Sequence, residues 1–141
     1  ARTVPARDFY EAAYFTAREE DEILTGISFT ASGGGYAYEK QKRKIGDYAT
    51  AAAGVLLTME RGSCTAASVA LTNLSDTPVY CADAVDALVG SSVDDATVKA
   101  AVAAAVDASD PVADTRGPVD FKKYVAGVIV KKAIKSARAR A

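Results

Sequence analysis

The sequence contains no histidine, and this absence removes the side chain most used in acid–base and metal chemistry. Serine–histidine–aspartate and cysteine–histidine nucleophiles are excluded. Cysteine is scarce as well, because Cys64 and Cys81 are too few and too far apart for a CxxC-type metal site. We expect two buried thiols in a reducing compartment, although one disulfide between them is also compatible with the sequence. Neither a metal site nor a self-contained catalytic site is predicted.

Long hydrophobic runs and an excess of one charge are also missing. No apolar stretch is long enough to cross a bilayer and no signal peptide is visible, which favours a cytoplasmic protein. The net charge of the 141 residues is −1, whereas a dedicated nucleic-acid binder usually has a strong basic excess. Residues 60–120 are rich in carboxylates, and the cations gather in the last twenty residues. We therefore expect no nucleic-acid partner.

The first half of the chain has the patterns of strands and loops. Period-two alternation predicts strands over residues 23–29 and 36–40, and a hairpin of residues 48–60 and 64–74 with Gly62 in its turn. Asp8 is expected to cap a short helical turn over residues 9–13. Ser32 and the three glycines after it form a loop, because they lack the GxGxxG and P-loop spacings of a phosphate cradle.

The second half has the patterns of helices. The first helix is expected to begin at the pair Thr77–Pro78 and to end before Gly90, and the next begins near Ser92. The last helix runs from about residue 120 to the C-terminus. The inward faces are expected to be Cys81, Val85 and Leu88; Val98, Val102 and Val106; and Phe121, Tyr124, Val125, Val128, Ile129 and Ala133. Strands followed by helices predict the α+β class, with a three-stranded antiparallel sheet packed with a three-helix bundle.

A basic segment between these halves, YEKQKRKIGDYATAAAG at residues 38–54, is the best candidate for a binding site. In a strand that ends near Lys40, the side chains of Tyr36, Tyr38 and Lys40 share one face. Two rings and a cation suit a planar anionic ligand. The alternative is that both tyrosines belong to the core and the lysines are solvated, and the pattern alone favours this alternative.

Four blocks of the sequence, which together cover almost the whole chain, resemble a known family. They are RTVPARDFYEAAYFTAREEDEILTGISF, YAYEKQKRKIGDYATAAAGVLL, VALTNLSDTPVYCADAVDALVG and DTRGPVDFKKYVAGVIVKKAI. In this order they resemble the flavoprotein (medium) subunit of the molybdenum hydroxylases, and most of all its carbon monoxide dehydrogenase branch. The family's C-terminal domain has a three-stranded antiparallel sheet and three helices.

The resemblance implies an FAD cofactor and four residues beside it. Leu24 in EILT and Lys40 in EKQ match two flavin-contacting positions of the related xanthine dehydrogenases, and Asp47 matches an aspartate seven residues after that lysine. Tyr48 is the best match for a tyrosine that lies against the flavin ring. Lys40 would sit near the electron-rich edge of the ring and Tyr48 would stack and exclude water. Asp47 would orient a neighbouring cation or backbone amide.

The resemblance also implies a division of the chain and a set of partners. Residues 1–32 would be the C-terminal remnant of the FAD-binding domain, a short piece of its second lobe, and residues 33–141 the family's C-terminal domain. The partners would be the missing N-terminal FAD-binding portion, a small [2Fe-2S] subunit and a large molybdopterin subunit, in the cytoplasm or at the inner face of the membrane.

The chain departs from the family in two places. The AGGHS- and TIGG-like diphosphate loops are absent, and Thr30 replaces a proline that usually ends the first strand. We therefore expect this chain alone to be inactive and not to retain FAD. A cofactor-free domain for subunit interaction, or a basic nucleic-acid-binding module, is the alternative function.

Overall fold

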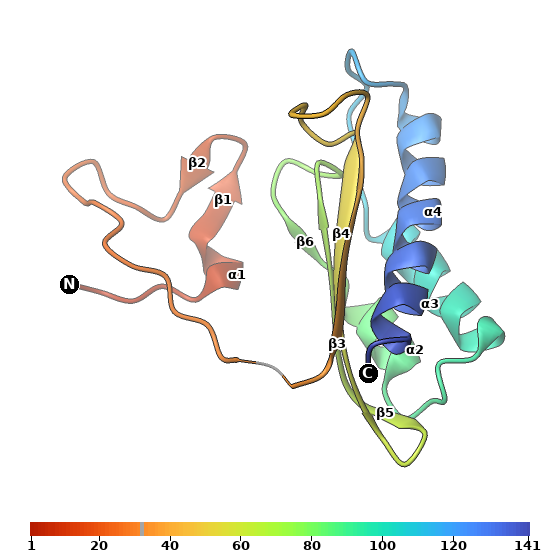
Figure 1. Ribbon diagram of the computed structural model, residues 1–141. Coiled ribbons are helices and arrows are strands. Elements are labelled where there is room, and N and C mark those ends of the chain that lie inside the picture. Colours follow the sequence, from red (N-terminus) through yellow and green to blue (C-terminus); the bar gives the residue numbers. More distant parts are fainter. Residues whose placement is uncertain (32) are drawn as a thin grey trace.

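The computed structural model describes residues 1–31 and 33–141, which fall into two parts (Figure 1). The first part holds helix α1 (Ala6–Phe9) and the strands β1 (Tyr10–Ala12) and β2 (Phe15–Thr16). The second part holds strands β3 (Gly35–Gln41), β4 (Ala51–Glu60), β5 (Ser63–Thr72) and β6 (Val79–Tyr80), and helices α2 (Ala82–Leu88), α3 (Asp95–Asp107) and α4 (Val119–Arg138). Ser32, where the sequence places the domain boundary, lies outside the described residues, so this boundary stays a prediction.

The second part is an antiparallel sheet covered on one face by helices. The strand order is β3-β4-β5-β6, and α2, α3 and α4 all lie on the same side of it (Figure 1). Val55, Leu57, Val69 and Leu71 point toward the helices and are at most 1% exposed. Cys64 and Cys81 belong to the same core and are free thiols, as expected. The α+β class is confirmed, and β6 is a short fourth strand that the sequence did not indicate.

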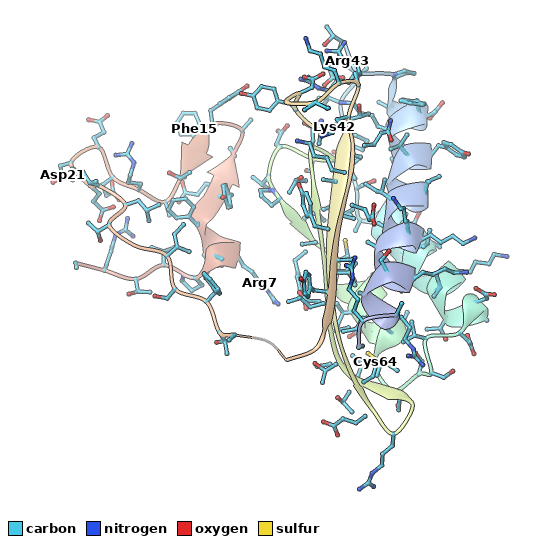
Figure 2. The ribbon with its side chains drawn as sticks, viewed as in Figure 1. Arg7, Phe15, Asp21, Lys42, Arg43 and Cys64 are labelled. Carbon is cyan, nitrogen blue, oxygen red and sulfur yellow. The ribbon has the colours of Figure 1, made fainter. Side chains whose placement is uncertain are left out.

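The other face of the sheet is not covered by α2, α3 or α4 and is partly apolar. Tyr36 and Tyr38 of β3 are 64% and 63% exposed there, and Leu56 of β4 lies beside them. The expectation that these two tyrosines are core residues is therefore wrong. Residues 1–31 lie on this side of the sheet (Figure 2), where the guanidinium of Arg7 stacks 3.6 Å from the ring centroid of Tyr80.

The hairpin of β4 and β5 follows the sequence pattern closely. Glu60 pairs with Ser63, so its turn consists of Arg61 and Gly62, which have φ angles of 51° and 85°. Two consecutive residues with positive φ are the mark of a type I′ turn, whose twist matches that of the flanking strands. The pairing of Val55 with Val69 then places both side chains on the helix-covered face.

Two predictions for residues 1–31 are wrong. Residues 23–29 alternate in polarity but form no strand, and Ile23, Ile27 and Phe29 are each more than three-quarters exposed. Alternating polarity makes a segment suitable for a sheet, but a strand also needs a neighbouring strand to pair with its backbone N–H and C=O groups. The helical turn also comes earlier than expected, because Pro5 rather than Asp8 is the residue that precedes it.

Two helices differ from expectation in their start or their phase. Val79 and Tyr80 pair with β5, and this pairing delays α2 to Ala82 although Thr77 and Pro78 are good helix-start residues. In α4, the predicted inward residues Phe121, Tyr124 and Val128 are 44%, 71% and 49% exposed. Among the described residues, no helix is long and apolar enough to cross a membrane.

The phase of α4 follows from a buried cation. Lys122 is only 2% exposed, and it shares the inward face with Val125, Ile129 and Ala133. Polar contacts that are described below satisfy its ammonium group. Lysines are normally expected outside the core, so the sequence pattern predicts the wrong buried face for the first half of this helix.

Gly35 provides a sharp test of how α4 packs against β3. A Cβ atom at this position would overlap the backbone carbonyl of Ala137 and press on Ala141. We expect Gly35→Ala to lower the free energy of unfolding by about 1–3 kcal/mol in urea titrations. Gly33→Ala is the matched control, because its Cβ meets nothing within 4 Å. Equal stability of the two variants would contradict this packing.

Candidate functional site

Three of the four predicted site residues lie at one end of the sheet. Lys40 is near the end of β3, and Asp47 and Tyr48 lie in the loop of residues 42–50 that joins β3 to β4. Lys40 and Tyr48 are exposed, Tyr48 to 80%. Leu24 is 55% exposed on the separate segment 1–31, which Figure 1 shows well to one side of this loop. The structure therefore brings together Lys40, Asp47 and Tyr48 but not Leu24.

The base of the loop is fixed although its tip is exposed. The backbone N–H of Thr50 donates to the carbonyl of Gln41 at 2.8 Å, which closes the loop across the end of the hairpin. The side-chain amide of Asn73 donates to the carbonyls of Ala49 and Thr50 from the next strand end. Gly46 has a φ of 81°, a left-handed conformation that glycine adopts readily and that lets the loop turn back toward β4.

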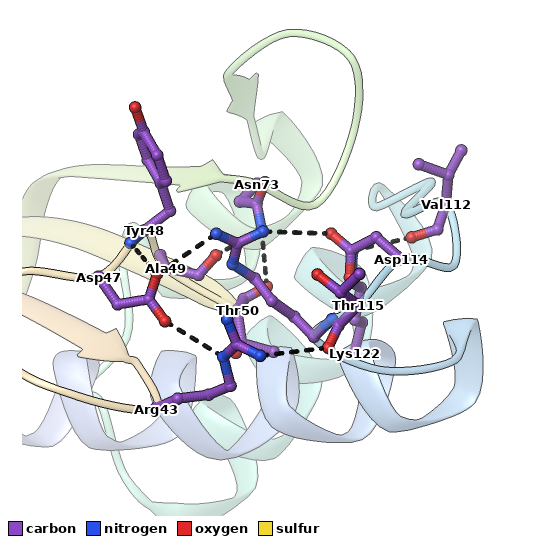
Figure 3. A network of polar contacts seen from close by, with 11 residues as sticks. Arg43, Asp47, Tyr48, Ala49, Thr50, Asn73, Val112, Asp114, Thr115 and Lys122 are labelled. Carbon is purple, nitrogen blue, oxygen red and sulfur yellow. Dashed lines mark hydrogen bonds and ion pairs between the residues drawn. The ribbon is translucent and has the colours of Figure 1, made fainter.

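Asp47 holds the loop together (Figure 3). Its Oδ2 atom accepts a hydrogen bond from Nε of Arg43 at 3.1 Å, and its Oδ1 atom accepts the backbone N–H of Tyr48 at 2.9 Å. Oδ1 also lies 3.4 Å from Nη2 of Arg116, which is distant in the sequence. Asp47 thus orients two cations and one backbone amide, as its position in the sequence predicts, while a role beside a cofactor stays a prediction.

The environment of Asp47 favours its ionised form. Desolvation is the largest single effect and raises the pKa of this carboxyl group. The hydrogen bonds from Arg43 and the Tyr48 amide, together with the charges of Arg43 and Arg116, outweigh it and lower the pKa. The carboxylate is therefore ionised at neutral pH and forms ion pairs with both arginines.

A second loop, residues 109–118 before α4, supplies Arg116. The buried Nζ of Lys122 lies 3.0 Å from Oδ2 of Asp114 and donates to the carbonyl of Val112 at 2.8 Å. Asp114 in turn accepts the backbone N–H of Arg116 at 2.8 Å, and a two-way backbone bridge joins Asp114 to Gly117. These contacts tie the loop to the first turn of α4, and from this loop the side chain of Arg116 reaches Asp47.

Arg116 connects the second loop to the aromatic ring of the first. Its Cζ atom lies 5.5 Å from the ring centroid of Tyr48, a distance at which a guanidinium and an aromatic ring attract each other. Its side chain is 19% exposed, and among the described residues its buried Nε atom has no hydrogen-bond partner. The Tyr48 ring is therefore exposed to solvent but lies within reach of the Arg116 guanidinium.

Sequence reasoning missed Asp114, Arg116 and Lys122. The segment SDPVADTRGP reads as a break between helices, which it is, and its Asp-x-Arg-Gly turn carries the only hint of an organised polar loop. The contact of Arg116 with Asp47 spans 69 residues, so no local pattern reveals it. The exposed lysines at positions 40, 42 and 44 match the solvated basic run that the sequence suggests, whereas Arg43 is bound to Asp47.

A shallow groove lies on the open sheet face. It measures about 280 Å³, and its residues include Tyr36, Tyr38, Gly54, Leu56 and Ser68. This volume is below the usual range for sites that enclose a drug-sized ligand. The groove is therefore too small for a dinucleotide, and the organised exposed ring of Tyr48 remains the better candidate site.

The described residues thus form an α+β domain with a cationic, aromatic loop at one end of its sheet. Residues 36–137 match the CO dehydrogenase flavoprotein C-terminal domain family, and the chain belongs to that family. It contains no diphosphate-binding loop of the kind that the resemblance to flavoproteins led us to look for.

Similar proteins agree with this assignment. The chain is 50% identical to the carbon monoxide dehydrogenase medium chain of Afipia carboxidovorans. The match covers 100% of this chain and 50% of that protein. A structure of CO dehydrogenase from Oligotropha carboxidovorans matches 99% of this chain and 50% of its own chain, with 49% identity and a TM-score of 0.94. Quinoline 2-oxidoreductase from Pseudomonas putida 86 matches 98% of this chain and 48% of its own, with 30% identity and a TM-score of 0.91. The chain thus spans about half the length of these relatives.

The buried lysine is expected to matter for stability. Lys122→Ala removes one partner of a pair whose lysine is 2% exposed, and we expect a loss of about 3 kcal/mol in the free energy of unfolding. Lys132→Ala is the control, because Lys132 is 67% exposed although it pairs with Glu39 at 2.8 Å. The control is expected to lose less than about 1 kcal/mol. Urea titration of both variants measures the difference, and similar losses would contradict the special role of Lys122.

The stability of the second loop is expected to depend on pH through Asp114. The hydrogen bond from Lys122, and after it the backbone N–H of Arg116, lowers the pKa of Asp114 in the folded chain. The unfolded chain has an aspartate pKa of about 3.9, so the ionised carboxylate stabilises the fold fully above about pH 5 and progressively less as the pH falls through 4. Urea titrations from neutral to acid pH should show the stability difference between wild type and Asp114→Asn shrinking below pH 5, as this account requires. A constant difference would show that Asp114 is not held in this way.

Proposed function

We propose that this chain is the C-terminal part of an FAD-containing electron-transfer subunit of a molybdenum hydroxylase, of the carbon monoxide dehydrogenase type. In this subunit it covers one side of the flavin and helps to dock the iron–sulfur and molybdenum subunits. The family membership of residues 36–137 and the names of the relatives support the subunit class. The observation that carries the covering role is the ring of Tyr48, 80% exposed yet anchored at its base.

An exposed aromatic ring on an organised loop is prepared for a planar partner. The backbone amide of Tyr48 is bound by Asp47, and its ring lies against Arg116. Because the loop is already ordered, a second ring that stacks on the free face of Tyr48 costs little conformational entropy. Stacked rings also exclude water from the face that they share. Tyr48 therefore suits the role of a lid on one face of an isoalloxazine ring.

Lys40 adds charge to the same end of the sheet. Its side chain is exposed at the end of β3, and Lys42 and Lys44 follow on the adjoining loop. A cation at the edge of a flavin favours negative charge on the ring and thereby shifts its reduction potential upward. Bound FAD supplies the electron-accepting and electron-donating chemistry of such a subunit.

The residues present fit one wall of a flavin site rather than a whole FAD site. The ring of Tyr48 and the ammonium of Lys40 match the ring system, but no residue set matches the diphosphate, and the groove of about 280 Å³ on the open sheet face is too small for it. We therefore propose that the preceding half of the subunit binds most of the FAD and that this chain alone does not retain it. Leu24 belongs to this proposal only through its match to the family, since it lies on segment 1–31 and not on the loop.

The docking role is supported by apolar side chains that α4 leaves uncovered. Phe121, Tyr124 and Val128 are spaced along one outer stripe of the helix and are 44%, 71% and 49% exposed. An uncovered apolar stripe on a helix is typical of a surface that contacts another protein. The same stripe supports the second candidate function, a cofactor-free interaction domain, and the flavin experiment below separates the two. A cytoplasmic location stays a prediction.

The covering role is tested in a chimera that joins this chain to the other half of the Afipia carboxidovorans medium chain. Titration with FAD, followed by flavin fluorescence, gives the dissociation constant. We expect Tyr48→Ala to weaken FAD binding about tenfold, through loss of the stacked ring. Lys40→Ala is expected to weaken it about threefold, through loss of an exposed charge.

Two controls show whether such losses are specific. Tyr124→Ala removes an equally exposed ring, 71% exposed, from α4, and Lys44→Ala removes an exposed cation from the same loop. Both are expected to bind FAD like the parent chimera. Unchanged affinity in Tyr48→Ala and Lys40→Ala would overturn the covering role and leave the interaction domain.

A further inference from the structure

Arg116 lies where the two loops of the site meet, and it contacts both of them. On the second loop, its backbone N–H donates to Asp114 at 2.8 Å and its Nη1 atom lies 3.8 Å from Oδ2 of the same carboxylate. On the first loop, its Nη2 atom lies 3.4 Å from Oδ1 of Asp47. The guanidinium thus lies between two carboxylates from segments that are far apart in the sequence.

Tyr48 is tied to Arg116 in two ways. The ring centroid is 5.5 Å from Cζ of Arg116, so the guanidinium attracts the ring directly. The backbone N–H of Tyr48 donates to Oδ1 of Asp47, the same oxygen atom that Arg116 contacts. Both the ring and the backbone of this residue therefore depend on where the guanidinium lies.

We infer that Arg116 is a positioning residue that holds the exposed ring of Tyr48 in the orientation needed to stack on a planar ligand. This inference rests on the proposed flavin-covering role and deepens it. A tyrosine that is 80% exposed samples several rotamers unless something holds it, and an ordered ring binds a second ring more tightly because less freedom is lost. Among the described residues, the ring contact that the structure shows for Tyr48 is the one with Arg116.

Arg43 offers a natural comparison, because it binds the same carboxylate without reaching the ring. Its Nε atom is 3.1 Å from Oδ2 of Asp47 and its Nη1 atom is 3.5 Å from the carbonyl of Thr115. It is also far more exposed than Arg116, 56% against 19%. If charge on Asp47 were all that mattered, the two arginines would be equivalent. Of these two arginines, Arg116 is the one whose guanidinium the structure places within reach of the Tyr48 ring.

The first part of the test observes the ring of Tyr48 in the full chain. Tyrosine rings labelled with ¹³C are followed by NMR, and the signals of Tyr48 are those lost in Tyr48→Phe. We expect Arg116→Gln to move these signals to the positions of a free tyrosine, while Arg43→Gln leaves them in place. Unmoved signals in a folded Arg116→Gln variant would overturn the inference. If that variant fails to fold, Arg116→Lys decides, since it keeps the charge but loses the guanidinium group and is expected to move the signals part of the way.

The second part measures the consequence in the FAD-binding chimera. We expect Arg116→Gln to weaken FAD binding about three- to tenfold, the range of one cation–ring contact, and Arg116→Lys to recover part of the loss. Equal weakening by Arg116→Gln and Arg43→Gln would show that only charge on Asp47 matters, which overturns the positioning role.

Failure of this inference differs from failure of the proposed function. If Tyr48→Ala leaves FAD affinity unchanged, the covering role is wrong, whatever the NMR signals show. If Tyr48→Ala weakens binding while Arg116→Gln does not, the covering role stands and the positioning role of Arg116 is wrong.

Discussion

The buried ammonium group of Lys122 is the constraint on which the rest of the site depends. A lysine that is 2% exposed must find polar partners, and it finds them in the carboxylate of Asp114 and the carbonyl of Val112. Both partners belong to the loop before α4, so satisfying the lysine fixes that loop against the helix. Arg116 is then aimed at Asp47, and through it at Tyr48. A requirement of the core thus determines the position of an exposed ring.

The sheet separates the stabilising part of the domain from the surfaces that face outward. The helices cover one face, where Leu57 and Leu71 are fully buried. This apolar packing stabilises the domain, and the charged loop lies outside it at one end of the sheet. Tyr36 and Tyr38 on the open face, like Tyr124 on the outer side of α4, are exposed aromatic residues. Exposed aromatic residues of this kind are typical of surfaces that contact other proteins.

The parts of the fold that obey local rules were predictable. The β4–β5 hairpin follows from alternation and an Arg-Gly turn. Helix α3 was expected to begin near Ser92; it begins at Asp95, with Asp94 as the cap that accepts the N–H of Thr97 at 2.8 Å. The errors have a tertiary origin. Strand β6 delays α2 because β5 offers it a partner, and residues 23–29 stay irregular. Helix α4 is rotated because its core includes a paired lysine, which hydrophobic periodicity treats as a surface residue.

The site was predicted in part, from family resemblance rather than from local patterns. Resemblance to a family located Lys40, Asp47 and Tyr48, which the structure places at one end of the sheet. It did not find Arg116, because the contact with Asp47 joins loops 69 residues apart and leaves no trace in local spacing. Leu24 matches a family position but lies on segment 1–31, outside the loop that carries the other three. Long-range polar contacts are the part of such a site that one sequence does not reveal.

A crystal structure of the Lys122→Met variant tests the central claim most directly. The variant keeps the volume of the buried side chain but removes the ammonium group that binds Asp114. The account predicts that α4 and the sheet remain in place, while the loop of residues 109–118 changes its path and the guanidinium of Arg116 moves away from the ring of Tyr48. An unchanged loop, with Arg116 still bound to Asp47 and still beneath the ring, would contradict it.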